Sequence, residues 1–381
     1  MALLFCIIAL AVVVALQNNL YRRHTFRNMR YRCYFSTDEA YEGDEIELVE
    51  ELTNAKLLPI PWMKTDFTTS RWLDFAGTRS VVTDDSRFVA SFFMLRSYHK
   101  VQRRWKVRCT RRGVFEIGRV SLVASDLLGN HVASKAVESG ARITVLPDPL
   151  QLEDINYSPT RATGDVLVRR SLISDPFYIV GAREYMEGDP MNRIDWLATA
   201  RTRQLMVHKN AFTASPSTAV LLNMQSREFE RGKPIDAANI EDCIHVCAGL
   251  FYASLHDNIP VELLANSAAE EGTVSTGLSY GVGHVANLLR TLAALPPESS
   301  GDFSRWLAEE GPSVKATDVI IVSSYLNEGM LAYAEGRPGV KFIIIGYADP
   351  KILPPDCEAI LLFDLLKRRK ERHETESSSA V

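Results

Sequence analysis

Residues 181–210 read GAREYMEGDPMNRIDWLATARTRQLMVHKN and gather many charges around one large aromatic side chain. Asp189-Pro190 has the form of a helix start, because Asp accepts hydrogen bonds from unpaired backbone N–H groups and Pro fits the first helical position. The expected helix runs to about Arg201 and places Trp196 in the core. Replacing Trp196 with Ala would then lower the free energy of unfolding by about 3–5 kcal/mol, as for other buried aromatics.

The charges on this helix allow more than one interpretation. Arg193, Leu197 and Arg201 are spaced four apart and would therefore share one helix face. Such a face is either a solvated surface or a contact for a partner. A hydrolase-type site built from Asp189, Asp195 and Arg193 is the alternative, since an acid and a base placed together can move protons.

Several pieces of this stretch match the motif of one protein family. The pieces are Arg183-Glu184-Tyr185, Gly188-Asp189, Ile194-Asp195-Trp196 and Ala200-Arg201. They resemble the bacterial family called domain of unknown function 58, so the signature residues here are Arg183, Glu184, Tyr185, Gly188, Asp189, Arg193, Asp195, Trp196 and Arg201. The resemblance implies a membrane-anchored protein with a von Willebrand factor A-like domain, commonly encoded beside a MoxR-type AAA+ ATPase. It implies no reaction, because the family has none firmly assigned.

The overall composition is that of an ordinary folded protein. Of 381 residues, 46% are hydrophobic and 24% are charged, and the length suggests about two domains. The net charge of -4 gives no general case for nucleic-acid binding, and we expect no nucleic-acid partner. The 6 cysteines are scattered without a C-x-x-C pair, which favours free thiols in a reducing compartment over a disulfide framework.

An apolar segment opens the chain. Residues 2–16 read ALLFCIIALAVVVAL, and residues 20–21 can extend this run toward the roughly 20 residues that cross a bilayer. The basic segment at residues 22–33 contains five Arg and no acid, so the positive-inside rule keeps it in the cytoplasm. We therefore expect residues 1–21 to be a single-pass anchor in the cell membrane, with the later domains cytoplasmic. A cleaved signal peptide is the alternative, although no basic residue precedes the apolar run.

Residues 34–149 show the alternating pattern of β-strands. Short segments with apolar residues at every second position are separated by Gly, Pro and Asn, which favours a β-sandwich. The basic run at residues 103–112, interrupted by Trp105, is either a surface for acidic lipid or nucleic acid or the outward side of a strand. We favour the outward side, since charge runs are usually solvated faces. Residues 150–213 follow as a connector that carries the signature motif.

Residues 214–365 change to alternating strands and helices. Continuous apolar strands between helices are typical of a parallel sheet covered on both faces. The expected strands are 218–222, 259–264, 272–276, 318–323, 340–346 and 359–363. The expected helices are 236–257, 282–295, 303–310 and 326–335. Residues 366–381 are charged and Ser-rich, so we expect a disordered tail.

The whole chain is thus expected to be α/β: an N-terminal membrane segment and β-sandwich, then a doubly wound, mostly parallel sheet. By the resemblance, that sheet is von Willebrand factor A-like and would bind a divalent cation through D-x-S-x-S after its first strand. Here Asn223, Gln225 and Arg227 occupy those three positions, and the later strand ends in Ser323 without an Asp. Hard cations need anionic oxygen ligands, so we expect a degenerate site without a metal. Arg227 could instead meet a carboxylate of a partner.

The other candidate motifs carry little weight. Gly281-x-Gly283-x-x-Ala286 resembles a dinucleotide fingerprint, but no strand-ending acid follows it at the expected spacing. Cys243 and Cys247 lie one helical turn apart, and two ligands do not complete a zinc site. The usual nucleophile, zinc-protease and phosphate-loop motifs do not occur in the sequence. The sequence therefore predicts no catalytic residues and no cofactor.

These observations predict a membrane-anchored interaction or scaffold protein rather than an enzyme. The partner that the resemblance implies is a MoxR-type AAA+ ATPase, and the process is cell-envelope assembly. A deep pocket with shifted carboxylate pKa values at the signature stretch would favour the hydrolase alternative, whereas a flat surface there would favour the scaffold.

Overall fold

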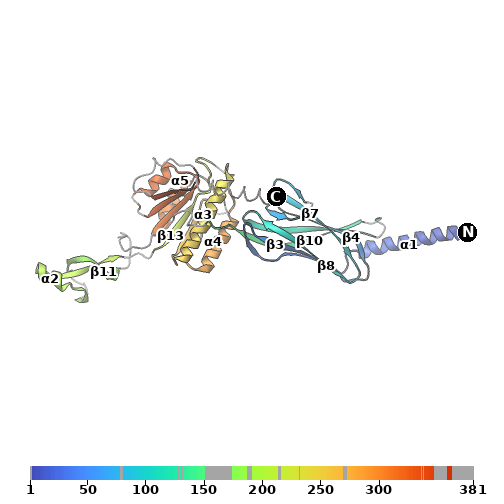
Figure 1. The fold of residues 1–381 in the computed structure, drawn as a ribbon, viewed down its shortest axis with the longest axis horizontal. Helices are drawn as coiled ribbons and strands as arrows, with labels where there is room; N and C mark the ends of the chain where they lie inside the picture. The colour runs from blue at the N-terminus through green and yellow to red at the C-terminus, as the bar shows by residue number, and fades with distance from the viewer. Residues whose placement is uncertain are drawn as a thin grey trace, which may run out of the picture. The chain divides into compact units, whose positions relative to one another are not determined.

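A computed structural model describes most of the chain, and Figure 1 shows its fold. The described residues are 2–362, except for 78–79, 127–128, 130–131, 151–173, 187–190, 213–215, 231, 269–272, 336, 338 and 347–357. The predicted tail and much of the predicted connector lie outside this part of the chain. Two compact units are present: unit 1 is Met1–Asp148 with Leu289–Leu295, and unit 2 is Pro149–Leu288 with Pro296–Val381.

Unit 1 begins with a single long helix, α1, Ala2–His24, which contains the whole apolar run (Figure 1). Among the described residues, none of the helices reaches the length and apolarity of a membrane span. The basic residues 22–33 do not form a separate segment as predicted. They divide between the last turn of α1 and strand β1, Met29–Phe35, because the alternating pattern of the strand already starts at Met29.

The rest of unit 1 is a sandwich of two sheets, which confirms the predicted strand-rich region. The sheet orders are β1-β3-β8-β5 and β2-β10-β9-β4-β7-β6. Every second residue points inward, so Leu48 of one sheet and Phe67 of the other are buried in the same apolar cluster. The further strands are β2 Glu39–Tyr41, β3 Glu45–Asn54, β4 Ile60–Ser70, β5 Leu73–Phe75, β6 Val81–Val82, β7 Ser86–Leu95, β8 Lys100–Cys109, β9 Gly113–Ser125 and β10 Val132–Leu146.

Arg103 donates to the carbonyl of Phe92 at 2.9 Å and Arg112 is 6% exposed, so only part of the basic run at residues 103–112 lies on the outer side of the sheet, along β8. Arg104, Lys106 and Arg108 are exposed there, while Val107 and Cys109 point into the core. Strand β3 places acids opposite these bases, with Glu47 facing Lys106 in the antiparallel register. The Nη1 atom of Arg104 lies 3.2 Å from Oε2 of Glu47. The bases are therefore matched by acids within the sheet, as expected for a solvated face.

Unit 2 is built on a sheet with the order β15-β14-β13-β16-β17-β18. Neighbouring strands are parallel from β14 through β18, and the short β15 runs antiparallel to β14. The strands are β13 Thr218–Leu222, β14 Val261–Ala265, β15 Val274–Ser275, β16 Asp318–Ser323, β17 Val340–Ile344 and β18 Glu358–Leu361. The six predicted strands are all present. Short apolar runs between helices are typical of buried strands, so the sequence pattern predicts them well.

Helices cover both faces of this sheet. The helices are α3 Ala237–His256, α4 Val282–Ala294, α5 Phe303–Glu310 and α6 Glu328–Ala334, with a 3-10 turn at Gly311–Ser313. Asp302 and Asn327 are the N-cap residues of α5 and α6. Their side chains accept hydrogen bonds from backbone N–H groups in the first turn of each helix. Both helices pack on the sheet face that carries Leu221 and Ile321. The buried helix α3 packs against β13 and β16 from the side opposite this cluster.

The signature stretch forms a small module instead of the single long helix predicted. Strands β11, Ser174–Glu184, and β12, Met206–Phe212, pair as an antiparallel hairpin. Between them lie a 3-10 turn, Met191–Arg193, and the short helix α2, Trp196–Thr202. The predicted start at Asp189 falls outside the described residues, and the predicted helix interior around Arg193 is wrong.

The helix begins later because Asp195 is its cap. The Oδ1 atom of Asp195 accepts from the backbone N atoms of Leu197 and Ala198, each at 3.0 Å. Two Asp residues in this stretch could start a helix, and the sequence pattern selects the earlier one. Arg193 therefore lies in the preceding 3-10 turn and cannot share a helix face with Leu197 and Arg201.

Candidate functional site

The carboxyl ends of β13 and β16 meet at one edge of the parallel sheet, and the residues compared with a metal motif lie together there. Asn223 and Ser323 are both fully buried. The Nδ2 atom of Asn223 donates to Oγ of Ser323 at 2.9 Å, and its Oδ1 atom accepts from the backbone N of Gln225 at 2.9 Å. The two strand ends are thus joined by side-chain hydrogen bonds.

Gln225 extends this network to two further loops. Its Oε1 atom accepts from the backbone N of Phe303 at 2.8 Å and from the hydroxyl of Tyr325 at 2.9 Å. Its Nε2 atom donates to the carbonyl oxygen of Glu230 at 2.6 Å. Burial, more than any neighbouring group, raises the pKa of Tyr325 to about 12, so its hydroxyl remains a donor at neutral pH. Three of the four hydrogen-bonding positions of the Gln225 amide are therefore occupied by protein partners.

The carboxylate of Glu230 closes the loop that follows β13. It is 7% exposed, and its Oε2 atom accepts from the backbone N of Ser226 at 2.6 Å. The hydroxyl of Ser226 donates to the same carboxylate at 3.0 Å, and the backbone N of Ile235 donates to Oε1. Because these donors occupy its lone pairs, Glu230 holds the loop in place rather than facing open space.

This edge of the sheet is saturated by its own hydrogen bonds. Within the described ranges, no group of three or more His, Cys, Asp or Glu side chains could hold a metal ion. The oxygens of Asn223, Gln225 and Ser323 are neutral and already take part in hydrogen bonds. A divalent cation would have to break these hydrogen bonds without gaining an anionic ligand. The absence of a metal here stays a prediction that calorimetry can test.

Arg227 is at an exposed tip of the same loop: its backbone N donates to Oε2 of Glu230 at 3.4 Å, and its side chain is exposed. Arg227 and Glu228 are exposed, and Phe229 is 79% exposed with a φ of 63°. A positive φ is unfavourable for a bulky residue, so the bonds around Glu230 must hold this tip in place. The tip therefore presents a cation and an aromatic ring to solvent above a rigid base.

The signature module has a different character, with a minimal core and a large exposed apolar surface. Ile194 and Val207 are buried and form an antiparallel bridge. Trp196, which the sequence places in the core, is instead 69% exposed, so that prediction is wrong. The reason is local: α2 has seven residues, buries none of them, and lies over a two-stranded hairpin with little apolar area to offer. Met191 and Leu197 are also more exposed than buried.

The remaining signature residues lie around this apolar surface or outside the described part. Arg183, Glu184 and Arg201 are exposed, and Tyr185 is half-buried with its backbone N donating to the carbonyl of Leu205 at 2.8 Å. Gly188 and Asp189 lie outside the described residues, and so does the side chain of Arg193. The acid and base of the hydrolase alternative are therefore not seen together.

His208 is a residue of this module that the sequence analysis missed. Its Nδ1 atom lies 3.4 Å from Oδ2 of Asp195, but it makes no hydrogen bond to any described residue. The two residues approach because the hairpin turns the chain back on itself. The apolar run at residues 205–207 ends one position before His208, so the sequence pattern around His208 gave no signal.

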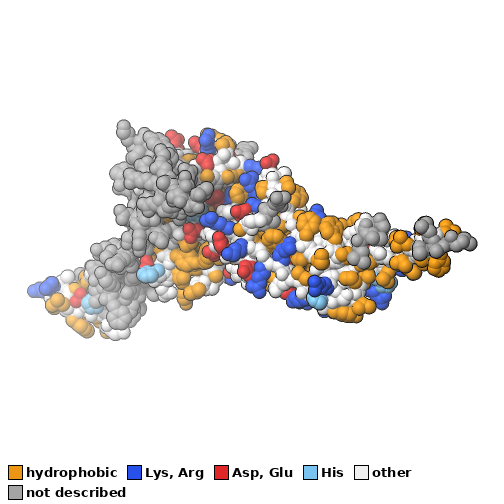
Figure 2. All heavy atoms as spheres, turned by 45° about the vertical axis from the view of Figure 1, so that its right-hand side comes forward, with side chains coloured by type: hydrophobic (Ala, Val, Ile, Leu, Met, Phe, Trp, Pro, Cys, Tyr) orange, Lys and Arg blue, Asp and Glu red, His pale blue; other side chains and the backbone are white. Residues whose placement is uncertain are grey.

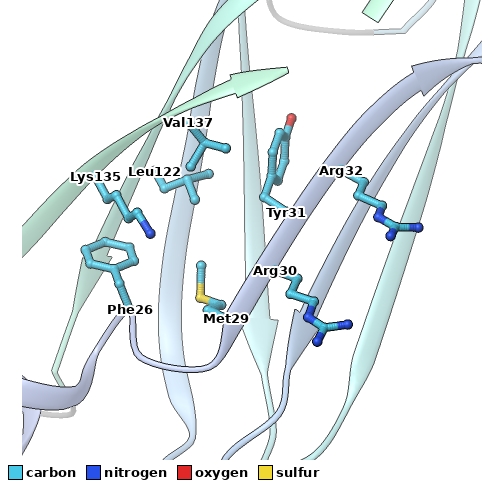
Figure 3. A pocket seen from close by; sticks show the side chains of 8 residues that line it. All are labelled: Phe26, Met29, Arg30, Tyr31, Arg32, Leu122, Lys135 and Val137. Carbon is cyan, nitrogen blue, oxygen red and sulfur yellow. The ribbon is translucent and has the colours of Figure 1, made fainter. Parts of the chain in front are cut away.

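A cavity of about 270 Å³ lies in unit 1, between β1 and the strands β9 and β10. It is lined by Phe26, Met29, Arg30, Tyr31, Arg32, Leu122, Lys135 and Val137 (Figure 3). Arg30 and Arg32 point away from the other six side chains, which are mostly apolar (Figure 3). None of the lining residues belongs to the signature stretch, so this cavity gives the hydrolase alternative no support.

Comparison with solved structures finds only distant likenesses. A non-cellulosomal cohesin from the archaeon Archaeoglobus fulgidus is 14% identical, with a TM-score of 0.21, and the match covers 29% of this chain and 91% of that one. The sixth cohesin of scaffoldin B from Acetivibrio cellulolyticus is 12% identical, with a TM-score of 0.22, over 30% of this chain and 98% of that one. Likenesses at these scores support no inference about fold or function.

Sequence comparison is more informative. The uncharacterized protein YeaD of Bacillus subtilis (strain 168) is 26% identical over 190 residues, which are 49% of this chain and 44% of YeaD. The match thus spans less than half the length of that relative. Residues 181–356 match the model of the family described as protein of unknown function DUF58. That range includes the exposed module and the bonded edge of the sheet. Residues 181–356 of this chain are therefore similar to the DUF58 family, as the signature motif predicts.

Proposed function

We propose that this chain is a membrane-anchored scaffold whose signature module docks a protein partner. The observation that carries the proposal is the exposed apolar surface of the module. Trp196, Leu197 and Met191 are 69%, 65% and 68% exposed, although residues of these types are buried wherever a fold allows it. Clustered exposed apolar side chains mark interaction sites, and Trp is the residue most enriched in binding hot spots.

The charge around this surface indicates the kind of partner. Arg183, Arg201 and Arg203 are exposed on the same module. A basic rim around an apolar centre is complementary to an acidic surface with an apolar pocket. The family resemblance supports a MoxR-type AAA+ ATPase as that partner and cell-envelope assembly as the process.

The anchoring part of the proposal rests on α1. Leu4, Phe5, Leu10 and Leu16 are each more than half exposed, and apolar side chains follow the described length of the helix (Figure 2). Exposure of a helix that is apolar on all sides to water is unfavourable, so such a helix is stabilised by burial in a bilayer or against a partner. The Arg residues that follow it support a cytoplasmic position for the rest of the chain.

The parallel sheet supports the finer description of a metal-free von Willebrand A-like domain. Five parallel strands with helices on both faces present their carboxyl-end loops at one edge, the usual position for a ligand. At that edge Asn223, Gln225 and Ser323 bond to protein groups in place of a cation. We infer that the sheet serves as a scaffold and that the module makes the contact.

A photo-crosslinking amino acid at Leu197 tests the docking proposal in intact cells. We expect a crosslink to a AAA+ ATPase, and no such crosslink from the same amino acid at Lys315, which is exposed elsewhere in unit 2. Trp196→Ala should weaken the Leu197 crosslink several-fold without changing the amount of protein in membranes. If the two positions crosslink the same proteins to the same extent, the module is not a docking site.

The hydrolase alternative has one observation in its favour, the approach of His208 to Asp195 at 3.4 Å. Asp195→Asn separates the two functions, because Asn keeps an oxygen that caps α2 but cannot act as an acid or base. Docking through the module predicts that this variant crosslinks normally. A hydrolase would lose its activity in the same variant.

A further inference from the structure

Three segments without an acidic residue lie together at the end of unit 1 where α1 joins the sandwich, beside the buried Asp126, whose Oδ2 atom accepts from Nε2 of Gln17 at 3.5 Å. The segments are residues 22–32, residues 55–59 and residues 94–100. They contain several Arg together with apolar and aromatic residues. We call this surface the α1-proximal end face.

The end face is fastened to α1 by a buried lysine. Lys56 is 9% exposed, and its Nζ atom donates to the carbonyl oxygens of Thr25 and, at 3.1 Å, of Arg27. These carbonyls lie just past the last turn of α1, where a cation is favourable. The hydroxyl of Tyr21, on α1 itself, donates to the carbonyl of Pro59 at 3.0 Å. The loop at residues 55–59 is therefore fixed against the end of the helix.

The third segment is fixed to the second. Asn54 is fully buried, and its Nδ2 atom donates to the carbonyls of Leu58 at 2.9 Å and Arg96 at 3.0 Å. The backbone N of Tyr98 donates to the carbonyl of Lys56 at 3.2 Å. Because the backbone of both loops is held from inside, their outward side chains keep fixed positions beside α1.

Those outward side chains are unusual for a solvated surface. Leu57, Met94 and Tyr98 are 75%, 67% and 69% exposed. Tyr98 has a φ of 54°, which is unfavourable for a bulky residue and turns its ring away from the sandwich. Arg22, Arg23, Arg27 and Arg96 are exposed in the same three segments.

We propose that the α1-proximal end face binds the surface of an anionic lipid bilayer, with Leu57 and Tyr98 in the interface and the Arg side chains on headgroups. Tyr is favoured at the level of the headgroups because its ring is apolar and its hydroxyl is polar. Each Arg near an anionic surface adds attraction, and no acid in these segments opposes it. The proposal rests on the anchoring proposed above, since α1 would bring this face to the membrane.

Lipid fits this face better than an acidic protein does, for two reasons. The face is continuous with the exposed apolar surface of α1, so one planar apolar phase can cover both. The apolar side chains also stand at the tips of two loops, which suits shallow insertion, whereas the docking pocket of a protein would need one central anchor.

Depth-dependent fluorescence quenching tests the proposal on the full chain in lipid nanodiscs. A fluorophore is attached to Leu57→Cys in a background of Cys6→Ser and Cys357→Ser, which leaves the four buried cysteines Cys33, Cys109, Cys243 and Cys247. The matched control is Val81→Cys, which is 68% exposed on β6 and pairs with Phe88 near the beginning of β7, away from residues 94–100. A third probe, at Leu10→Cys, reports on α1. The quencher for Leu57 and Val81 is a lipid spin-labelled near its headgroup, and the quencher for Leu10, about halfway along α1, is a lipid spin-labelled near the end of its acyl chain.

We expect strong quenching at Leu57 in phosphatidylglycerol, on the order of threefold weaker quenching in phosphatidylcholine because headgroup attraction is lost, and none at Val81. Arg96→Glu should reduce the quenching at Leu57 in phosphatidylglycerol. Quenching at Leu10 without quenching at Leu57 would overturn the lipid contact and leave the face to a protein partner. Quenching at Leu57 without quenching at Leu10 would instead remove the anchor and keep the contact.

Discussion

Glu50 is a buried carboxylate that ties the two sheets of unit 1 together. It is fully buried and accepts from the hydroxyl of Tyr31 at 3.0 Å and from Nε1 of Trp105 at 2.8 Å, both in its own sheet. It also accepts from Thr65 at 2.9 Å and Ser91 at 2.6 Å, which lie on β4 and β7 of the other sheet. Burial, and then the charge of Glu50, raise the pKa of Tyr31, so its hydroxyl stays a donor.

Glu50→Gln should therefore destabilise unit 1 despite its small change in shape. An amide offers one oxygen instead of two. If that oxygen keeps the Trp105 indole, the NH₂ group faces the hydroxyls of Tyr31 and Thr65, whose hydrogens then lose their buried acceptor. We expect the free energy of unfolding in urea to fall by about 1–3 kcal/mol, the cost of a buried donor without a partner. Glu47→Gln is the control, because its bond to Arg104 is exposed and is worth about 1 kcal/mol or less. Equal losses in both variants would contradict the role of Glu50.

Lys56 gives a prediction about pH. Burial lowers its pKa to about 8 in the folded protein, whereas an unfolded Lys titrates at about 10.4. Between these values the unfolded chain binds more protons than the folded chain, so the contribution of Lys56 to stability rises with pH across this window. Lys56→Met cannot titrate and should lack this rise in urea unfolding between about pH 8 and pH 10. If the free energy of unfolding changes with pH in the same way in the variant and in the wild-type protein, folding does not lower the pKa of Lys56.

At the scale of elements, the edge of the parallel sheet gives a prediction about metals. Its side-chain oxygens already accept hydrogen bonds from N–H and O–H groups. The buried carboxylate of Glu230 accepts hydrogen bonds from Ser226 and Ile235. We expect no heat of binding in calorimetry with millimolar Mg²⁺ or Ca²⁺, and partner binding that survives EDTA. Saturable binding that disappears in Asn223→Ala would show that the loop holds a cation after all.

The exposed tip of that loop gives a linked prediction. If Arg227 meets a carboxylate of the partner, Arg227→Glu should weaken partner binding at least tenfold, because an attraction becomes a repulsion. Glu228→Gln changes the charge at the neighbouring exposed position and serves as the control. Equal binding by wild type and Arg227→Glu would confine the contact to the signature module.

The same elements show what could be predicted from the sequence. The parallel sheet was predictable because apolar runs such as residues 218–222 and 318–323 are long enough to be buried and are flanked by helices with clear caps. The hydrogen-bonded edge was only half predictable. The positions of Asn223 and Ser323 follow from the strand ends. No spacing in the sequence predicts that Tyr325 bonds to Gln225 or that the carboxylate of Glu230 joins the network.

The signature module was the least predictable part. Its cap signals occur twice, at Asp189 and Asp195, and local preference cannot choose between them. Trp196 is large and apolar, so burial is the default expectation, and only the small size of the hairpin explains its exposure. A large apolar side chain that is exposed, against the usual expectation of burial, is expected at an interaction site.

At the scale of the whole molecule, the proposed orientation in the membrane connects the proposed anchor with the chemistry of the cysteines. The apolar run is followed by five Arg within residues 22–32. Cys33 and Cys243 are buried free thiols, and burial raises their pKa to about 11 and about 12. Thiols that stay protonated in a packed core suit a compartment without disulfide formation.

A reporter enzyme fused to the C-terminus should therefore be active only in the cytoplasm. The cause can be tested on the same fusion, because orientation follows the balance of Lys and Arg on the two sides of the apolar run. Replacing Arg22, Arg23 and Arg27 with Ala and adding three Lys before Ala2 should move the reporter to the outside. Activity outside the cytoplasm in the unaltered fusion would overturn the orientation, and the Arg residues of the α1-proximal end face would then meet the outer leaflet. If the altered fusion keeps its reporter inside, the orientation is set by the folded units and not by the Arg flank.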